Sequence, residues 1–106
     1  MAQVAVSGAA CTTGHDCDAV TTVLGGSPNV KIGNIGVLTV GDPLSPHTIR
    51  NPAFPPPPLC IDHPNQKVNE GSASVFVNDR PIARVGDSVD IAGEITEGES
   101  SVVAGG

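Results

Sequence analysis

The sequence predicts an all-β protein built from short hairpins, and three observations lead to that prediction. Gly and Pro are abundant, at 13 and 10 of the 106 residues, and both are disfavoured inside helices. Among the larger apolar residues Val and Ile predominate, which favours strands, and no window shows the period of an amphipathic helix. A segment of the chain also repeats at a fixed offset, which is typical of a repeated supersecondary unit.

The hairpins are predicted from the repeat, in which residues 26–42 match residues 71–87 at an offset of 45 with six of 17 positions identical. Each copy holds two short β-branched runs separated by residues that tolerate positive φ, as a tight turn requires. The first strands are expected at 30–32 and 75–77, the turns at 33–34 and 78–79, and the second strands at 37–40 and 82–85. A shorter echo at 97–103 suggests a third copy, so the repeats span approximately 8–42, 43–87 and 88–106.

Size and composition predict one domain with a small core. A chain of this length usually builds a single core, so residues 1–106 are expected to form one domain. There is no Trp, no Tyr and only two Phe, Phe54 and Phe76, so aromatic side chains cannot dominate the core. A domain with so little bulky apolar volume needs a further stabilising element such as a metal ion, a disulfide or a partner.

The charge balance argues against several classes of partner. The formal net charge is −6, and the only basic residues are the scattered Lys31, Arg50, Lys67, Arg80 and Arg84. Nucleic acid and anionic membrane surfaces are therefore not expected as partners. No apolar run is long enough to span a bilayer. The N-terminal residues lack the basic start and apolar stretch of a secretory signal, so synthesis in the cytoplasm is expected.

A proline-rich segment separates the two clear repeats. Residues 52–58 contain five prolines, which cannot donate to a strand ladder and favour an extended conformation. The segment is expected to be a stiff loop inserted between repeats. The alternative is a peptide ligand for an aromatic-lined groove of a partner.

Three histidines and one cysteine form the candidate metal site. His15, His47 and His63 all lie in connecting loops, and Cys60 precedes His63 by three residues. Imidazole and thiolate are preferred ligands of Zn²⁺, and four of them make a closed tetrahedral site. Loops from equivalent places in a repeat can converge, so His15, His47, Cys60 and His63 are predicted as the metal ligands. The alternative is that the histidines are solvent-exposed and bind nothing.

The other two cysteines leave several possibilities open. Three cysteines cannot all pair within one chain. Cys17 is the candidate substitute ligand, and Cys11 is expected to be a small buried residue. Cys11, His15 and Cys17 could also chelate a metal locally, or Cys11 and Cys17 could form a disulfide across a small loop.

The second repeat resembles a known family. Residues 71–87 run from Gly71-Ser72 through Pro81-Ile82-Ala83-Arg84 to Val85-Gly86-Asp87, and this pattern is similar to the PAAR-repeat proteins, named for a Pro-Ala-Ala-Arg motif. The resemblance covers roughly residues 8–106. It implies a small pointed cone with a pseudo-threefold arrangement of hairpins. It also implies a zinc ion near the vertex, held by three histidines and one cysteine, which by position are the four ligands predicted above.

The resemblance further implies a structural protein rather than an enzyme. Members cap the blunt end of a trimeric β-helical spike in contractile phage tails and type VI secretion systems, one copy per trimer, and sharpen it for piercing a target membrane. The expected location is therefore a phage tail tip or a secretion spike. The candidates for base or core positions are Val30, Ile32, Val75, Val77 and Val102. Zinc is the expected metal, with iron as an alternative.

The chain departs from the family pattern at three places. The first repeat has residues 36–39 in place of the motif, Gly8 lacks a following Asp, and the loop at 86–92 has no histidine.

A small zinc hydrolase is one alternative function. It would need an open coordination position and a general base, for which Asp16 and Asp62 are the adjacent acids. A generic metal-stabilised interaction module is the other alternative.

Overall fold

The structure, a computed structural model, describes residues 2–105, and these residues form twelve short strands and no helix. The prediction of an all-β fold is therefore confirmed. The strands are β1 (Ala2–Val4), β2 (Ala10–Thr12), β3 (Val20–Thr22), β4 (Lys31–Ile32), β5 (Ile35–Gly36), β6 (Thr48–Arg50), β7 (Cys60–Asp62), β8 (Phe76–Val77), β9 (Arg80–Pro81), β10 (Ser88–Val89), β11 (Gly93–Glu94) and β12 (Glu99–Ala104). Within the described range, no segment could cross a membrane as a helix.

The two predicted hairpins are present at the predicted offset. β4 pairs with β5 and β8 pairs with β9, both antiparallel. Their turns place Gly33-Asn34 and Asn78-Asp79 at positive φ, between 52° and 70°, as the tightest two-residue turns require. The second strands were expected two residues too late: β5 and β9 end at Gly36 and Pro81. Residues 37–40 and 82–85 lie beyond the hairpins and form only isolated bridges, such as Val37 with Val6 and Thr39 with Ile82.

A closed ring of three backbone hydrogen bonds lies at the centre of the molecule. Ala5 N–H donates to Ala83 (3.0 Å), Ala83 N–H to Leu38 (2.8 Å) and Leu38 N–H to Ala5 (2.9 Å). All three residues are fully buried. Each segment thus donates to one neighbour and accepts from the other, which is the hydrogen-bond pattern of a threefold arrangement within a single chain.

Three glycines follow the same threefold arrangement, each of them three residues after one member of the ring. Gly8, Gly41 and Gly86 have φ of 90°, 95° and 92°, a region that residues with a Cβ rarely occupy. Each turns the chain from the central ring into one of three rising arms. Gly8 therefore occupies the equivalent position even though the Asp that follows Gly41 and Gly86 is absent there.

The core is small and contains no aromatic side chain. One cluster of buried residues fills the centre (Ala5, Ala9, Cys11, Val23, Leu38, Leu44, Val68, Ala83, Val89, Ile95), and a second lies below it (Val4, Val6, Val37, Val77, Ile82, Ala104). Phe54 and Phe76 are exposed. Of the candidates for base or core positions, Val77 is buried, Ile32 is half-buried, and Val30, Val75 and Val102 are exposed.

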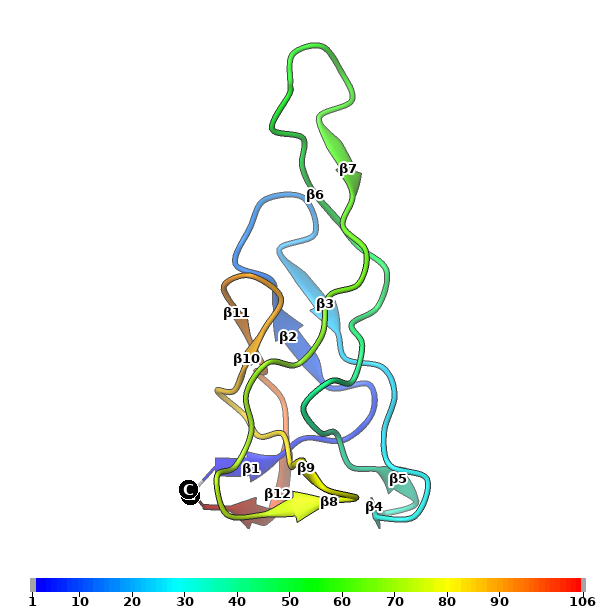
Figure 1. The fold of residues 1–106 in the computed structure, drawn as a ribbon, viewed down its shortest axis with the longest axis vertical. Helices are drawn as coiled ribbons and strands as arrows, with labels where there is room; N and C mark the ends of the chain where they lie inside the picture. Colours follow the sequence, from blue (N-terminus) through cyan, green and yellow to red (C-terminus); the bar gives the residue numbers. More distant parts are fainter. Residues whose placement is uncertain (1, 106) are drawn as a thin grey trace.

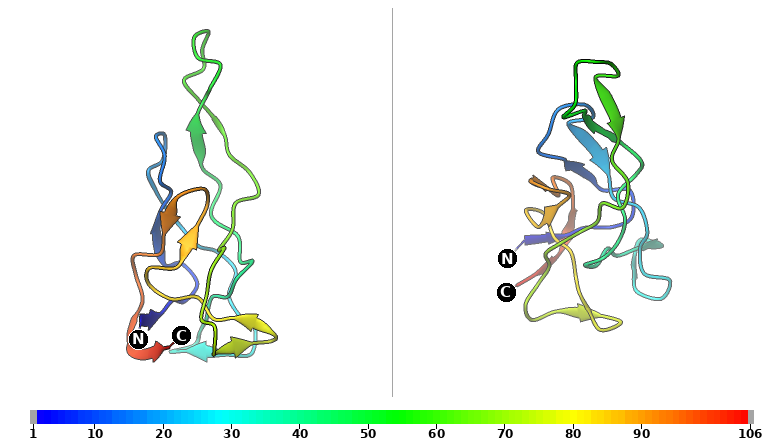
Figure 2. Two further views of the ribbon diagram at one scale, coloured as in Figure 1. Left: turned by 60° about the vertical axis from the view of Figure 1, so that its left-hand side comes forward. Right: turned by 45° about the horizontal axis from the view of Figure 1, so that its top comes forward.

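The molecule is elongated and tapers to one end, with extents of 47 × 23 × 23 Å. Figures 1 and 2 show the hairpins β4–β5 and β8–β9, together with β1 and β12, gathered at the broad end. Three arms rise from this base: β10–β11, β2–β3 and β6–β7, of which β6–β7 reaches furthest (Figure 1). The proline-rich segment is the loop that joins β6 to β7, at the narrow end.

Candidate metal centre

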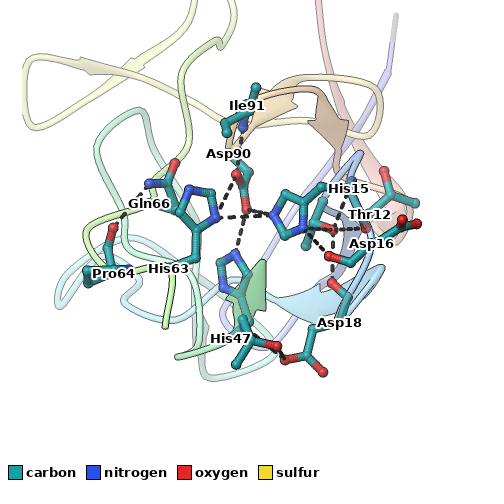
Figure 3. A network of polar contacts seen from close by, with 12 residues as sticks. Thr12, His15, Asp16, Asp18, His47, His63, Pro64, Gln66, Asp90 and Ile91 are labelled. Atoms are coloured by element: carbon teal, nitrogen blue, oxygen red, sulfur yellow. Dashed lines mark hydrogen bonds and ion pairs between the residues drawn. The ribbon is translucent and has the colours of Figure 1, made fainter. Parts of the chain in front are cut away.

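The three histidines come from two arms and converge on one point. His15 lies in the loop between β2 and β3, His47 directly precedes β6, and His63 directly follows β7. Their ring centroids are 4.9 to 5.5 Å apart. Figure 3 shows the three rings directed toward one another. The structure therefore brings together the three predicted histidines.

Asp90 supplies the fourth group, from the turn between β10 and β11. Its carboxylate is buried, with Oδ2 3.1 Å from His15 Nε2 and 2.5 Å from His47 Nε2. Oδ1 lies 3.5 Å from His63 Nδ1. One ligand atom from each of the four residues lies within 4.8 Å of the others, so the third arm completes the cluster.

Backbone carbonyls fix the orientation of two of the rings. His15 Nδ1 donates to the carbonyl oxygen of Asp16 (3.0 Å) and His47 Nδ1 to that of Ser45 (2.8 Å). A carbonyl oxygen can only accept, so in the neutral ring the proton is on Nδ1 and the lone pair is on Nε2. This outer hydrogen bond is the usual partner of a metal-ligating histidine.

The donor set fits a metal cation. In the neutral rings, the lone pairs of His15 Nε2 and His47 Nε2 face the carboxylate of Asp90, and acceptor groups this close repel one another unless a positive charge lies between them. Burial raises the pKa of Asp90, but when His47 and His15 carry a proton on Nε2 their hydrogen bonds, together with that of the Ile91 N–H, hold this pKa below its usual value. The cluster thus offers one anionic oxygen and three imidazole nitrogens, which can bind a metal ion.

Cys60 does not lie in this cluster. Its sulfur forms a disulfide with Cys17, with a Cα–Cα distance of 6.0 Å. The reason is local geometry: Cys60 begins β7, and in an extended chain side chains three residues apart point to opposite sides. Cys60 therefore points away from the side on which His63 meets the histidines. The short Cys-x2-His spacing would favour chelation on a turn, whereas here it lies along a strand.

Asp90 was not among the predicted ligands, although a signal for it exists. Val89 bridges to Val68 in the same way that Leu44 bridges to Val23, so the two loops that follow Val89 and Leu44 are equivalent. The loop after Leu44 carries His47, and the loop after Val89 carries Asp90. A search of the third repeat for any ligating side chain, instead of histidine alone, would have identified it.

Two of the acids beside the cluster, Asp16 and Asp18, are already engaged, whereas Asp62 is exposed to solvent. Asp18 Oδ2 accepts hydrogen bonds from the Thr48 N–H and hydroxyl, both 2.9 Å, and these bonds lower the pKa of Asp18. Asp16 forms an ion pair with Arg50 at 3.0 Å. Neither carboxylate is therefore an unpartnered base next to the cluster.

The remaining cysteine gives a first testable prediction. Cys11 is fully buried, and burial, followed by the charge of Asp90, raises its pKa to about 11. Since the thiolate is the reactive form, the folded protein is expected to show no thiol to an aromatic disulfide reagent at mildly alkaline pH. Unfolding without reductant should reveal one thiol, and unfolding with reductant three. A reactive thiol in the folded protein would contradict the burial of Cys11.

Two comparisons with known proteins bear on this site. A family model described as the PAAR motif matches residues 13–91, a range that includes all four residues of the cluster and both predicted hairpins. No curated protein matches the chain.

Proposed function

Because the chain belongs to the PAAR-motif family, we propose that it caps the blunt end of a trimeric β-helical spike, with one copy per trimer. The machine would be a contractile phage tail or a type VI secretion system, and the protein would sit at its tip and meet the target membrane first. Membership of the family supports a spike-tip role in a contractile injection system.

The single observation that carries the proposal is the threefold ring beneath a tapered body. A single chain that caps a trimer must present three similar edges to three identical strands. The hydrogen bonds linking Ala5, Leu38 and Ala83 give this chain an internal threefold arrangement, and the hairpins β4–β5 and β8–β9 and the β1–β12 pair gather at the broad end of the molecule (Figure 2). The opposite end narrows to one arm, as a point requires.

The base also carries apolar side chains that the rest of the described residues, 2–105, leave exposed. Exposed apolar residues lie on or beside the base strands β4, β5, β8 and β12: Val30, Ile35, Val75, Phe76, Val102 and Val103, each 37 to 56% exposed. Apolar residues gathered at one end of a monomer are typical of an interaction site. The trimeric spike is the partner that the family implies for this face.

We propose zinc, with iron as the alternative, as the metal held by His15, His47, His63 and Asp90. Three imidazoles and one carboxylate suit a tetrahedral Zn²⁺ site. The metal would tie the three arms together where the tapering body has little room for a core, since metal binding supplies folding free energy to small domains. Four ligands from the protein would fill a tetrahedral coordination shell, which supports a structural site over a hydrolase.

Spike binding tests the partner. Phe76→Asp with Val103→Asp places two charges on the base and is expected to weaken binding to a purified trimeric spike by at least about 100-fold, because each buried charge needs a partner. Phe54→Asp, at the opposite end, is the matched control and should bind as the parent does. Equal binding by the base variant, measured by titration calorimetry, would exclude the base as the docking surface.

A further inference from the structure

The loop between β6 and β7 is the far end of the molecule, and its surface is apolar. Residues 52–59 are eight consecutive exposed positions, Pro-Ala-Phe-Pro-Pro-Pro-Pro-Leu, with no charged or polar side chain among them. Phe54 and Leu59 are 45% and 41% exposed. The other Phe, Phe76, lies at the base. In a chain of net charge −6, this end of the β6–β7 arm is thus free of charge, and it projects beyond the other two arms (Figures 1 and 2).

The backbone of this loop presents few unsatisfied donors. Five of its eight residues are proline and have no N–H. Of the others, Ala53 N–H donates to the Asn51 side chain (2.9 Å) and Phe54 N–H to the Asn51 carbonyl (3.1 Å). The Asn51 amide donates in turn to the Pro58 carbonyl at 2.9 Å. An unpaired backbone donor costs several kcal/mol in hydrocarbon, so this loop avoids the part of the penalty that comes from N–H groups.

The loop is joined to the body by polar and covalent links just behind it. Arg50 pairs with Asp16 at 3.0 Å, and Cys60 is bonded to Cys17. Asn51 N–H donates to Leu59 at 2.7 Å and closes the neck of the loop. Charged residues therefore begin immediately behind the loop. The links at its neck hold the uncharged segment away from the body of the protein.

We propose that residues 52–59 enter the apolar interior of a lipid bilayer, and that this loop is the part of the protein that first contacts the target membrane. The inference rests on the proposed function for delivery of the tip to a membrane. The chemistry of the partner follows from the loop: an uncharged, donor-poor segment is compatible with hydrocarbon, and the acidic body disfavours anionic headgroups. The preferred surface is a zwitterionic bilayer.

Fluorescence tests the proposal cleanly, because the chain contains no Trp and no Tyr. Phe54→Trp introduces a single fluorophore in the loop, and Phe76→Trp is the matched control at the base, where the replaced ring is 56% exposed. With phosphatidylcholine vesicles in large excess, Phe54→Trp emission is expected to shift to shorter wavelength and to be quenched by brominated acyl chains. The Phe76→Trp emission should change in neither respect. Adding Leu59→Asp to Phe54→Trp should abolish the shift.

Two other outcomes would contradict insertion of the loop into the bilayer. An unchanged Phe54→Trp spectrum at the highest lipid concentration, or equal shifts in both variants, would overturn the proposal. If vesicles leave the spectrum unchanged while an isolated proline-recognition domain shifts it, the loop is a peptide ligand and the proposal is wrong. Spike binding and metal content, measured on Phe54→Trp, report separately on the proposed function.

Discussion

Asp90→Asn is expected to release the metal. The carboxylate is buried and lies within 3.5 Å of nitrogen atoms of all three histidines, so a neutral amide there removes the one anionic ligand. Loss of an outer hydrogen bond at metal sites typically costs about 10- to 100-fold in affinity, and loss of a ligand costs more. Elemental analysis of the purified variant should therefore fall from one metal ion per chain to a small fraction, and thermal stability should fall with it.

Asp62→Asn is the matched control for this experiment. Asp62 is an exposed carboxylate adjacent to His63 and lies outside the cluster, so its variant should keep the metal at full stoichiometry. His47→Ala should behave like Asp90→Asn, because His47 Nε2 is directed at the same point. Full metal content in both His47→Ala and Asp90→Asn would rule out this cluster as the metal centre.

Removing the disulfide is expected to destabilise the protein without releasing the metal. Cys17 and Cys60 are separated by 43 residues, and closing a loop of that length in the unfolded chain is worth about 4 kcal/mol in the chain-entropy account. Cys17→Ser with Cys60→Ser should lower the free energy of unfolding by about that amount in denaturant titrations. Metal content should be unchanged, since neither sulfur belongs to the cluster.

The two single variants separate the disulfide from the alternative that Cys60 is a zinc ligand. If the two sulfurs are bonded, Cys17→Ser and Cys60→Ser cost similar stability and both retain the metal. If Cys60 is a ligand, Cys60→Ser alone releases the metal and Cys17→Ser has little effect. The second pattern would restore the set of three histidines and one cysteine that the spacing first indicated.

The hairpins could be predicted from sequence because their determinants are local. Gly33-Asn34 and Asn78-Asp79 specify tight turns wherever they occur between β-branched runs, and the structure has both turns. The ring that joins Ala5, Leu38 and Ala83 could not be predicted in this way, because its three bonds connect segments far apart in the chain. No local sequence pattern indicates which of the short apolar segments will pair with one another at the centre of the molecule.

The candidate site shows the same division between local and non-local determinants. His15, His47 and His63 were identifiable because histidine is rare in this chain and each one lies in a loop. Cys60 was predicted as a ligand but lies outside the cluster, because β7 extends as far as Asp62. This places the side chains of Cys60 and His63 on opposite sides of the strand. Asp90 is one of 11 acidic residues, and only the bridges of Val89 and Leu44 mark its loop as equivalent to that of His47.

The central ring also determines how the protein folds. None of its three hydrogen bonds lies within a hairpin, and β1 pairs with β12, so Ala2 lies opposite Ala104. The chain must therefore close large loops before most of its apolar surface is buried, and chains dominated by such distant pairings fold in milliseconds to seconds. Individual hairpins of two-residue strands are unstable alone. The cone is thus expected to form cooperatively and late, with few stable partly folded states on the way.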